Sequence, residues 1–236
     1  MSWIVPPPPP ASLAVAGTAA RFPVRRVWCV GRNYAAHARE MGADPDREPP
    51  FFFAKPADAV VAAAVDGAVT VPYPPQTVLL HHEVELVVAL ALGGSHIAPA
   101  AAAAHIFGYA VGLDLTRRDL QAAAKKASQP WEMAKSFDAS APCSALLPAA
   151  AWQSAGARIR LDVNGERRQE AALTELIWPV AEVIAHLSRF VALAAGDILF
   201  TGTPEGVGPL LPGDVADAAI SGLPTLRVVI GAAGDP

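Results

Sequence analysis

Short apolar runs separated by turn-forming residues extend along most of the chain. Several runs are rich in valine, isoleucine and leucine, which is typical of buried strands. We expect strands at residues 27–30, 78–92, 108–115, 198–201 and within 213–230, and a hairpin at 158–169. The hairpin signal is the clearest, because Asn164-Gly165 is a preferred pair for a type I′ turn. Strands dominate and do not alternate regularly with helices, so the pattern favours an α+β fold.

Only a few short helices are expected. Residues 180–193 place their apolar side chains at helical spacing. Residues 34–41 predict a short helix that Asn33 caps and Gly42 ends. Further helical stretches are expected at residues 99–105, which are mostly alanine, and at residues 117–127.

The chain divides into two unequal parts. Residues 1–20 contain five consecutive prolines, Pro6–Pro10, and predict a proline- and alanine-rich arm that is stiff and extended. Residues 21–236 contain no low-complexity linker and no internal repeat. We therefore expect a single catalytic domain over residues 21–236.

Composition narrows the class of protein. The chain is 53% hydrophobic with a mean hydropathy of +0.32, which argues against disorder. It has no uninterrupted apolar run of about 18 residues, so no membrane span is expected, and its start lacks the pattern of a secretory signal. A net charge of −4 argues against nucleic acid as a partner. Cys29 and Cys143 match no ligand or disulfide motif, which fits a reduced cytoplasmic setting.

The segment His81-His82-Glu83-Val84-Glu85 carries the strongest chemical signal, because two carboxylates interrupt an apolar run. Glu83 and Glu85 are two residues apart, so in a strand they point to the same face. Like charges on a half-buried face are unfavourable unless something neutralises them, and a divalent cation does so with several oxygen ligands. The histidines lack the His-Glu-x-x-His spacing of a zinc site, which excludes that reading.

A third carboxylate, Asp114, shares a face of the strand at 108–115 with two small residues, Ala110 and Gly112. If this strand neighbours the one that carries Glu83 and Glu85, the three side chains form an oxygen-ligand site suited to Mg²⁺, Mn²⁺ or Ca²⁺. An exposed edge strand with hydrated glutamates has the same pattern. The pattern alone does not decide between these readings.

Two further groups of residues could carry chemistry. His37 and Glu40 are three residues apart on one helix face, where a carboxylate could orient an imidazole as a general base. A weak surface ion pair is the ordinary alternative. Lys135 lies between apolar and small residues and could point into a pocket, although most lysines are solvated.

A glycine-rich turn at residues 200–208 follows a strand. Its backbone amides and the hydroxyls of Thr201 and Thr203 could bind a small carboxylate, or it could be a plain turn. Arg117, Arg118 and Gln121 follow Asp114 closely and could be a polar helix face or substrate contacts.

These pieces occur in a specific order along the chain. The ordered set consists of Gly31-Arg32-Asn33-Tyr34-x-x-His37-x-x-Glu40, Phe53-x-Lys55-Pro56, His82-Glu83-x-Glu85-Leu86, Gly108-Tyr109 through Asp114, Arg118-Asp119-x-Gln121, Lys135-Ser136-Phe137-Asp138, Asn164-Gly165-Glu166-x-x-Gln169, Gly196-Asp197, Thr201-Gly202-Thr203-Pro204-x-Gly206-Val207-Gly208 and Gly213-Asp214. Over residues 24–230 the chain thereby resembles the fumarylacetoacetate hydrolase superfamily. Within it, the chain is most similar to the acylpyruvase branch and its bacterial fumarylpyruvate hydrolases.

The resemblance implies a mixed β-sandwich roll with short peripheral helices, assembled as a homodimer. It implies that Glu83, Glu85 and Asp114 bind one divalent cation, Mg²⁺ or Mn²⁺, in each subunit. The implied catalytic residues are His37, Glu40 and Lys135. The implied substrate-binding residues are Arg32, Arg118, Gln121, Lys135 and Thr203.

The implied reaction is hydrolysis of the C3–C4 bond of a 2,4-dioxo acid, and specifically of 3-fumarylpyruvate to fumarate and pyruvate in aromatic-compound degradation. The fumaryl arm carries a second carboxylate that needs a cation, for which Arg32, Arg117 and Arg118 are candidates. The alternatives are a lyase or isomerase of related oxo acids, such as an oxaloacetate decarboxylase or a dioxo-acid isomerase, and a non-catalytic metal- or small-molecule-binding protein.

Overall fold

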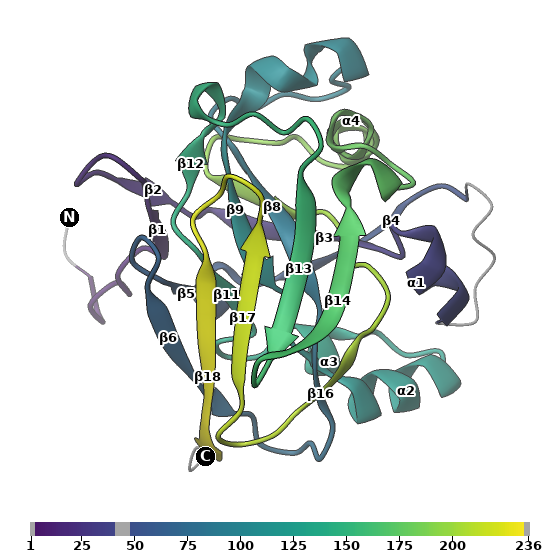
Figure 1. The fold of residues 1–236 in the computed structure, drawn as a ribbon. Helices are drawn as coiled ribbons and strands as arrows, with labels where there is room; N and C mark the ends of the chain where they lie inside the picture. The colour runs from purple at the N-terminus through teal and green to yellow at the C-terminus, as the bar shows by residue number, and fades with distance from the viewer. Residues whose placement is uncertain (1–2, 41–47, 234–236) are drawn as a thin grey trace.

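The computed structural model describes residues 3–40 and 48–233, and its larger sheets pack face to face (Figure 1). The eight-stranded sheet contains, in spatial order, β4 (Phe51–Lys55), β3 (Arg26–Gly31), β15 (Asp197–Phe200), β8 (Val84–Leu90), β9 (Ile106–Leu113), β11 (Ala141–Cys143) and β5 (Val60–Ala62), and β12 (Leu147–Pro148) also pairs with β9. The five-stranded sheet contains β14 (Glu166–Ala172), β13 (Arg158–Val163), β17 (Val215–Ile220), β18 (Leu226–Ala233) and β6 (Ala68–Tyr73). Both sheets mix parallel and antiparallel neighbours.

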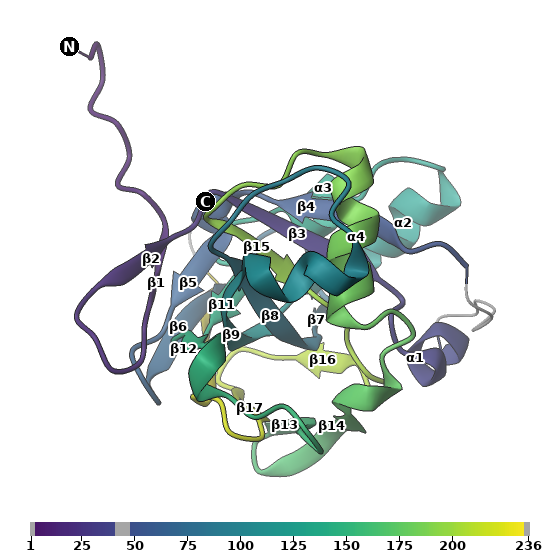
Figure 2. The ribbon, with the colours of Figure 1, turned by 90° about the horizontal axis from the view of Figure 1, so that it is seen from above.

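Smaller elements lie around these sheets. A three-stranded sheet joins β10 (Thr116–Arg117), β7 (Leu80–His82) and β16 (Gly208–Leu210). The α-helices are α1 (Ala35–Glu40), α2 (Arg118–Lys126), α3 (Glu132–Lys135) and α4 (Val180–Phe190), and 3₁₀ turns occur at Ala57–Ala59, Pro99–His105, Ala149–Ala151 and Leu173–Glu175. Figures 1 and 2 show α1 and α2 at the same end of the molecule. Within the described residues, no helix is both long and apolar enough to cross a membrane.

Side-chain alternation along the central strands builds two cores. Leu86 and Val88 of β8 face the core between the two large sheets, where the helix α4 also packs. Val87 and Ala89 face a second core on the opposite side of the eight-stranded sheet. Because both faces of β8 are covered, all its residues are buried and its sequence is apolar except at Glu85.

Most predicted elements are present, and the hairpin at 158–169 is confirmed. Asn164 and Gly165 have φ values of 52° and 82°, as a type I′ turn requires. The prediction of one continuous strand over residues 78–92 is wrong. The chain leaves the three-stranded sheet after β7 and enters the eight-stranded sheet at β8. Glu83 lies at this junction, between strands whose partners differ. The alanine-rich stretch at Pro99–His105 is a 3₁₀ helix.

The N-terminal segment has an exposed part and a part that packs against the domain. Residues 3–10 are exposed and extend away from the body (Figure 2). β1 (Ser12–Ala14) and β2 (Arg21–Pro23) then pair as a hairpin against the eight-stranded sheet. Leu13 is fully buried in the second core, and the ring of Phe22 lies 5.0 Å from that of Phe107. The segment predicted as an arm therefore contributes core residues from Leu13 onward.

Candidate active site

Three carboxylates meet where β8 begins and β9 ends. Glu85 pairs with Gly112 across these antiparallel strands, and the backbone N–H of Asp114 donates to the carbonyl of Glu83 over 2.8 Å. One oxygen from each of Glu83, Glu85 and Asp114 lies within 4.8 Å of the others. All three residues are at most 5% exposed. The reading of hydrated glutamates on an edge strand is therefore excluded, and the expected neighbourhood of the two strands is confirmed.

Cationic side chains surround two of these carboxylates. The Lys135 ammonium lies 2.8 Å from Glu83 Oε2 and 2.6 Å from Asp114 Oδ2. The Lys55 ammonium lies 2.8 Å from Asp114 Oδ1, and the Arg118 guanidinium pairs with Glu83 Oε1. Opposite charges are thus concentrated in a space from which water is largely excluded, where each interaction is stronger than at a surface.

The third carboxyl, Glu85, has a different environment. Its Oε2 accepts a hydrogen bond of 2.6 Å from the backbone N–H of Gly202. Burial, followed by repulsion from Asp114 and Glu83, raises the pKa of Glu85 well above its usual range. Burial alone would also raise the pKa of Glu83, but Lys135 and Arg118 outweigh it and hold that pKa well below its usual range. Of the three carboxyl groups, Glu85 is therefore the one whose ionised form the surrounding side chains stabilise least.

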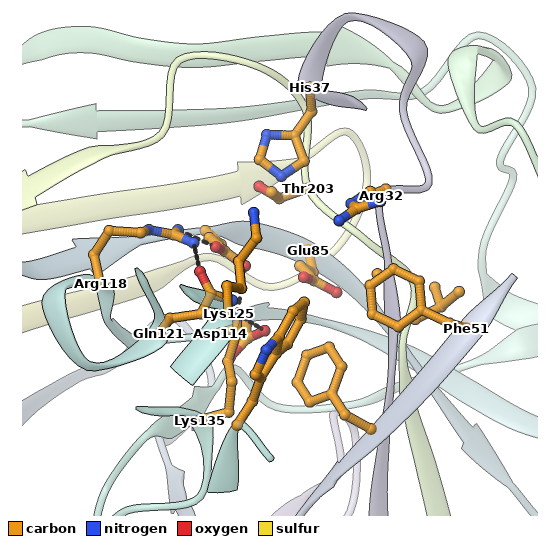
Figure 3. A pocket seen from close by; sticks show the side chains of 15 residues that line it. Arg32, His37, Phe51, Glu85, Asp114, Arg118, Gln121, Lys125, Lys135 and Thr203 are labelled. Carbon is orange, nitrogen blue, oxygen red and sulfur yellow. Dashed lines mark hydrogen bonds and ion pairs between the residues drawn. The ribbon is translucent and has the colours of Figure 1, made fainter. Parts of the chain in front are cut away.

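One pocket lies beside the three carboxylates, and Figure 3 shows its lining. His37 and Arg32 approach from one side, and Lys135, Asp114 and Gln121 lie on the other. The predicted site residues that line this pocket are Arg32, His37, Glu83, Glu85, Asp114, Arg118, Gln121, Lys135 and Thr203. The side chain of Glu40 lies outside the described residues.

The glycine-rich turn is held in place by buried amides. Gln169 Nε2 donates to Thr203 Oγ1 and to the carbonyl of Pro204, each over 2.8 Å. Gln169 Oε1 lies 3.1 Å from the backbone N–H of Val84 and 3.0 Å from His82 Nδ1. Because the Pro204 carbonyl can only accept and the Val84 N–H can only donate, the orientation of this amide is fixed. Thr203 Oγ1 is thus the acceptor, which leaves its O–H to donate to another group, and Thr203 lines the pocket.

Asn33 has a different role from the helix cap that the sequence predicts. Its Nδ2 donates to the carbonyls of Thr201 and Trp178 over 2.8 and 2.9 Å, and its Oδ1 accepts from the Trp178 N–H over 2.7 Å. Asn33 thereby joins the start of α1 to the glycine-rich turn. Gly202 in that turn has a φ of 96°, and a Cβ there would lie 2.6 Å from the Cβ of Asn33. Glycine is therefore required for this close approach.

Known proteins resemble this chain in sequence and in fold. The family model described as "Fumarylacetoacetate (FAA) hydrolase C-terminal" matches residues 26–230. The chain belongs to the fumarylacetoacetate hydrolase family. The structure of fumarylpyruvate hydrolase from Pseudomonas aeruginosa with Mn²⁺ and pyruvate is 52% identical, with a TM-score of 0.92 over 97% of this chain and 100% of that one. The predicted family, its fold and the similarity to bacterial fumarylpyruvate hydrolases are thus confirmed.

Other relatives within the fumarylacetoacetate hydrolase family are named for a different reaction. The oxaloacetate tautomerase YcgM of Escherichia coli is 41% identical over 203 residues, covering 85% of this chain and 90% of that protein. The mitochondrial oxaloacetate tautomerase FAHD1 of Mus musculus is 41% identical over 213 residues, covering 87% and 94%. The chain is therefore an enzyme of this family, of the hydrolase or the tautomerase type.

The donor set fits the divalent cation expected in a fumarylacetoacetate hydrolase fold. Three buried carboxylates offer converging hard oxygen ligands, and no cationic side chain of the described residues pairs with Glu85, which leaves this ligand for a metal ion. Mn²⁺ is present in the Pseudomonas aeruginosa relative. Glu83, Glu85 and Asp114 are thus suited to hold Mg²⁺ or Mn²⁺.

Sequence reasoning missed several residues of the site. Lys55 and Gln169 are part of the family-like motifs, but only the fold shows that one pairs with Asp114 and the other holds Thr203. Lys125 also lines the pocket and was missed, although its spacing from Arg118 and Gln121 places it on the same face of the expected helix. The rings of Phe51, Phe53 and Trp131 form one wall of the pocket.

Arg117, a sequence candidate for the second carboxylate of the substrate, does not line the pocket. Its guanidinium carbon lies 4.5 Å from the centre of the Phe137 ring, and its Nη1 donates to the carbonyl of Met133 over 3.3 Å.

Proposed function

We propose that this enzyme hydrolyses 3-fumarylpyruvate to fumarate and pyruvate. The observation that carries the proposal is the convergence of three carboxylates, the imidazole of His37 and the ammonium of Lys135 in one pocket. The similarity to the Pseudomonas aeruginosa fumarylpyruvate hydrolase supports the same substrate. A 2,4-dioxo acid offers one end for oxygen-rich binding and a carbonyl carbon, C4, for attack by water.

His37 would act as the general base. Its side chain is 5% exposed and enters the pocket above Thr203 in Figure 3. It takes a proton from water, and the hydroxide attacks C4. The C3–C4 bond then breaks, and its electron pair moves into the 2-oxo group. The fragment that contains C4 and the added hydroxyl leaves as fumarate. The imidazolium then returns a proton to C3 to give pyruvate. Glu40 would orient the imidazole.

Lys135 and Thr203 would stabilise the charge that develops on oxygen. The Lys135 ammonium is fixed by Glu83, Asp114 and a 2.7 Å hydrogen bond to Thr116 Oγ1, so it needs little reorganisation during the reaction. The Thr203 hydroxyl would donate to a substrate carboxylate or to the oxyanion formed at C4. Arg118 and Gln121, joined by a 2.5 Å hydrogen bond, would hold the pyruvyl end.

A divalent cation bound by Glu83, Glu85 and Asp114 would supply Lewis-acid polarisation of the 2-oxo group, which makes that group a better electron acceptor. Both Mg²⁺ and Mn²⁺ suit these oxygen ligands. Activity of the chelated protein titrated with each metal separately distinguishes them.

Two substitutions test the site. Glu85→Gln keeps the side-chain volume but removes a charged ligand, so hydrolysis and Mn²⁺ binding measured by calorimetry should both be lost. His37→Ala should lower kcat by about 10²–10⁴-fold with Mn²⁺ binding retained. His96→Asn is the control, because His96 is exposed and does not line the pocket. Normal hydrolysis by the Glu85 variant, or a His37 effect confined to KM, contradicts the assignment.

Oxaloacetate tautomerisation is the second candidate, favoured by relatives of 41% identity that carry that name. It moves a proton between carbon and oxygen and needs no water as nucleophile. The decisive comparison is kcat/KM for fumarylpyruvate hydrolysis, for oxaloacetate tautomerisation and for pyruvate release from oxaloacetate. Tautomerase activity without hydrolysis of any acylpyruvate would replace the first proposal with the second.

We also infer a homodimer from the family resemblance. Light scattering coupled to size-exclusion chromatography should then give twice the chain mass of 24.4 kDa. A mass of 24.4 kDa at micromolar concentration would contradict it.

A further inference from the structure

Two of the cations that line the pocket are not engaged by its carboxylates. Lys135 and Arg118 are held by Glu83 and, in the case of Lys135, also by Asp114. Within the described part of the chain, no carboxylate pairs with the other two, Arg32 and Lys125. The Arg32 guanidinium carbon lies 5.4 Å from the centre of the Phe51 ring. These two positive charges are therefore available to a ligand.

Helix geometry places Lys125 in the pocket. Arg118, Gln121 and Lys125 are spaced by three and four residues along α2, so they share one face of the helix. All three line the pocket, whereas the adjacent Lys126 does not. In Figure 3 the Lys125 side chain points toward the side of the pocket where His37 and Thr203 lie. Its amine is thus set apart from the Lys135 amine, which contacts the carboxylates.

An aromatic wall completes the pocket. The rings of Phe51 and Trp131 meet edge to face with centres 5.6 Å apart, and the Phe53 ring centre lies 6.3 Å from that of Trp131. Such flat apolar surfaces suit a planar, unsaturated carbon chain. The pocket therefore combines an oxygen-rich end, an apolar wall and two cations without carboxylate partners.

We propose that Lys125, together with Arg32, binds the distal carboxylate of the substrate and so selects acylpyruvates whose acyl group ends in a carboxylate. The inference rests on the proposed function, because it assigns the acyl end of the same substrate. An ammonium on an exposed helix face can meet this carboxylate as it enters and form a charge-assisted hydrogen bond. An uncharged acyl group gains nothing from it.

The test compares two substrates in matched variants. Lys125→Ala should lower kcat/KM for fumarylpyruvate at least tenfold, mainly through KM, and change kcat/KM for acetylpyruvate less than twofold. Lys126→Ala, the neighbouring exposed lysine outside the pocket, should change neither. Lys125→Arg should retain most of the preference for fumarylpyruvate over acetylpyruvate in kcat/KM, because arginine keeps the positive charge. Arg32→Asn, whose side chain tolerates the φ of 56° found at Arg32, should also lower the fumarylpyruvate preference.

The outcomes separate the inference from the function on which it rests. If the wild-type enzyme hydrolyses neither acylpyruvate, the proposed function fails. If it hydrolyses both, and Lys125→Ala lowers the two kcat/KM values equally or leaves both unchanged, the function stands and the role of Lys125 is wrong. Loss of the preference in Lys126→Ala would also overturn it, because a general surface charge would then be responsible.

Discussion

Replacing Gln169 with glutamate should turn the Thr203 hydroxyl away from the substrate. Gln169 is 1% exposed, and its amide donates to Thr203 Oγ1 and to the Pro204 carbonyl. An ionised glutamate donates nothing, and a protonated one supplies a single O–H for those two acceptors. The nearest free donor for the new carboxylate is the Thr203 hydroxyl itself. Once that hydroxyl donates to residue 169, it no longer donates into the pocket.

The size of the effect follows from one hydrogen bond to a charged oxygen. Such a bond contributes about 1.5–3 kcal/mol, and about 1.4 kcal/mol corresponds to a tenfold change in rate or affinity. Gln169→Glu should therefore lower kcat/KM for fumarylpyruvate about 10–100-fold. The unpaired Pro204 carbonyl should also lower the free energy of unfolding by about 1–3 kcal/mol.

A double-mutant cycle measured by steady-state kinetics and urea unfolding isolates this mechanism. Thr203→Val should reproduce the loss of kcat/KM, and Gln169→Glu should add little to it because the two changes remove the same donor. Thr203→Ser should retain most of the wild-type activity. Wild-type kcat/KM in Gln169→Glu, or effects of the two substitutions that simply multiply, would refute the reasoning.

Lys55→Met should lower the free energy of unfolding in urea by about 3 kcal/mol in chelator, because it removes a buried partner of Asp114; an unchanged midpoint would show that Lys135 alone balances Asp114. Chelation should abolish hydrolysis reversibly without unfolding the protein, because Lys55, Lys135 and Arg118 already balance Glu83 and Asp114. Mn²⁺ at one hundred times its Kd should then add about 2.7 kcal/mol of stability, or roughly 5–10 °C in Tm. Loss of far-UV circular dichroism in chelator at 25 °C would contradict this.

Local patterns predicted those parts of the structure that depend on neighbouring residues. The type I′ turn at Asn164-Gly165 and the alternation that places Glu85 on one face of β8 and Leu86 on the other are of this kind. The break between β7 and β8 at Glu83 was missed. A run of apolar residues looks the same in the sequence whether it forms one strand or two strands in different sheets. Only the three-dimensional pairing of β7 and β8 reveals it.

Long-range contacts explain the remaining differences. Lys55 lies 59 positions before Asp114 in the chain, and no spacing rule connects a lysine at the end of β4 with a carboxylate after β9, a strand that is not its neighbour in the sheet. Leu13 follows a proline run, which favours an extended arm, yet its side chain is buried against the eight-stranded sheet. Asparagine is a residue type that often caps helices, but the Asn33 side chain makes hydrogen bonds to the backbone of Trp178 and Thr201.

The residues of the site lie partly on a buried strand and partly on an exposed helix, and this difference affects which of them can be substituted without loss of stability. Glu85 belongs to a strand covered on both faces, and Glu83 and Asp114 adjoin that strand, so changes there disturb both cores. Lys125 lies instead at an exposed position of the peripheral helix α2, where its side chain has few packing contacts. If the proposed function holds, substitutions at Lys125 would change the preferred acyl group at little cost in stability, whereas the residues proposed to act on the 2-oxo acid are fixed by the packing of the sheet.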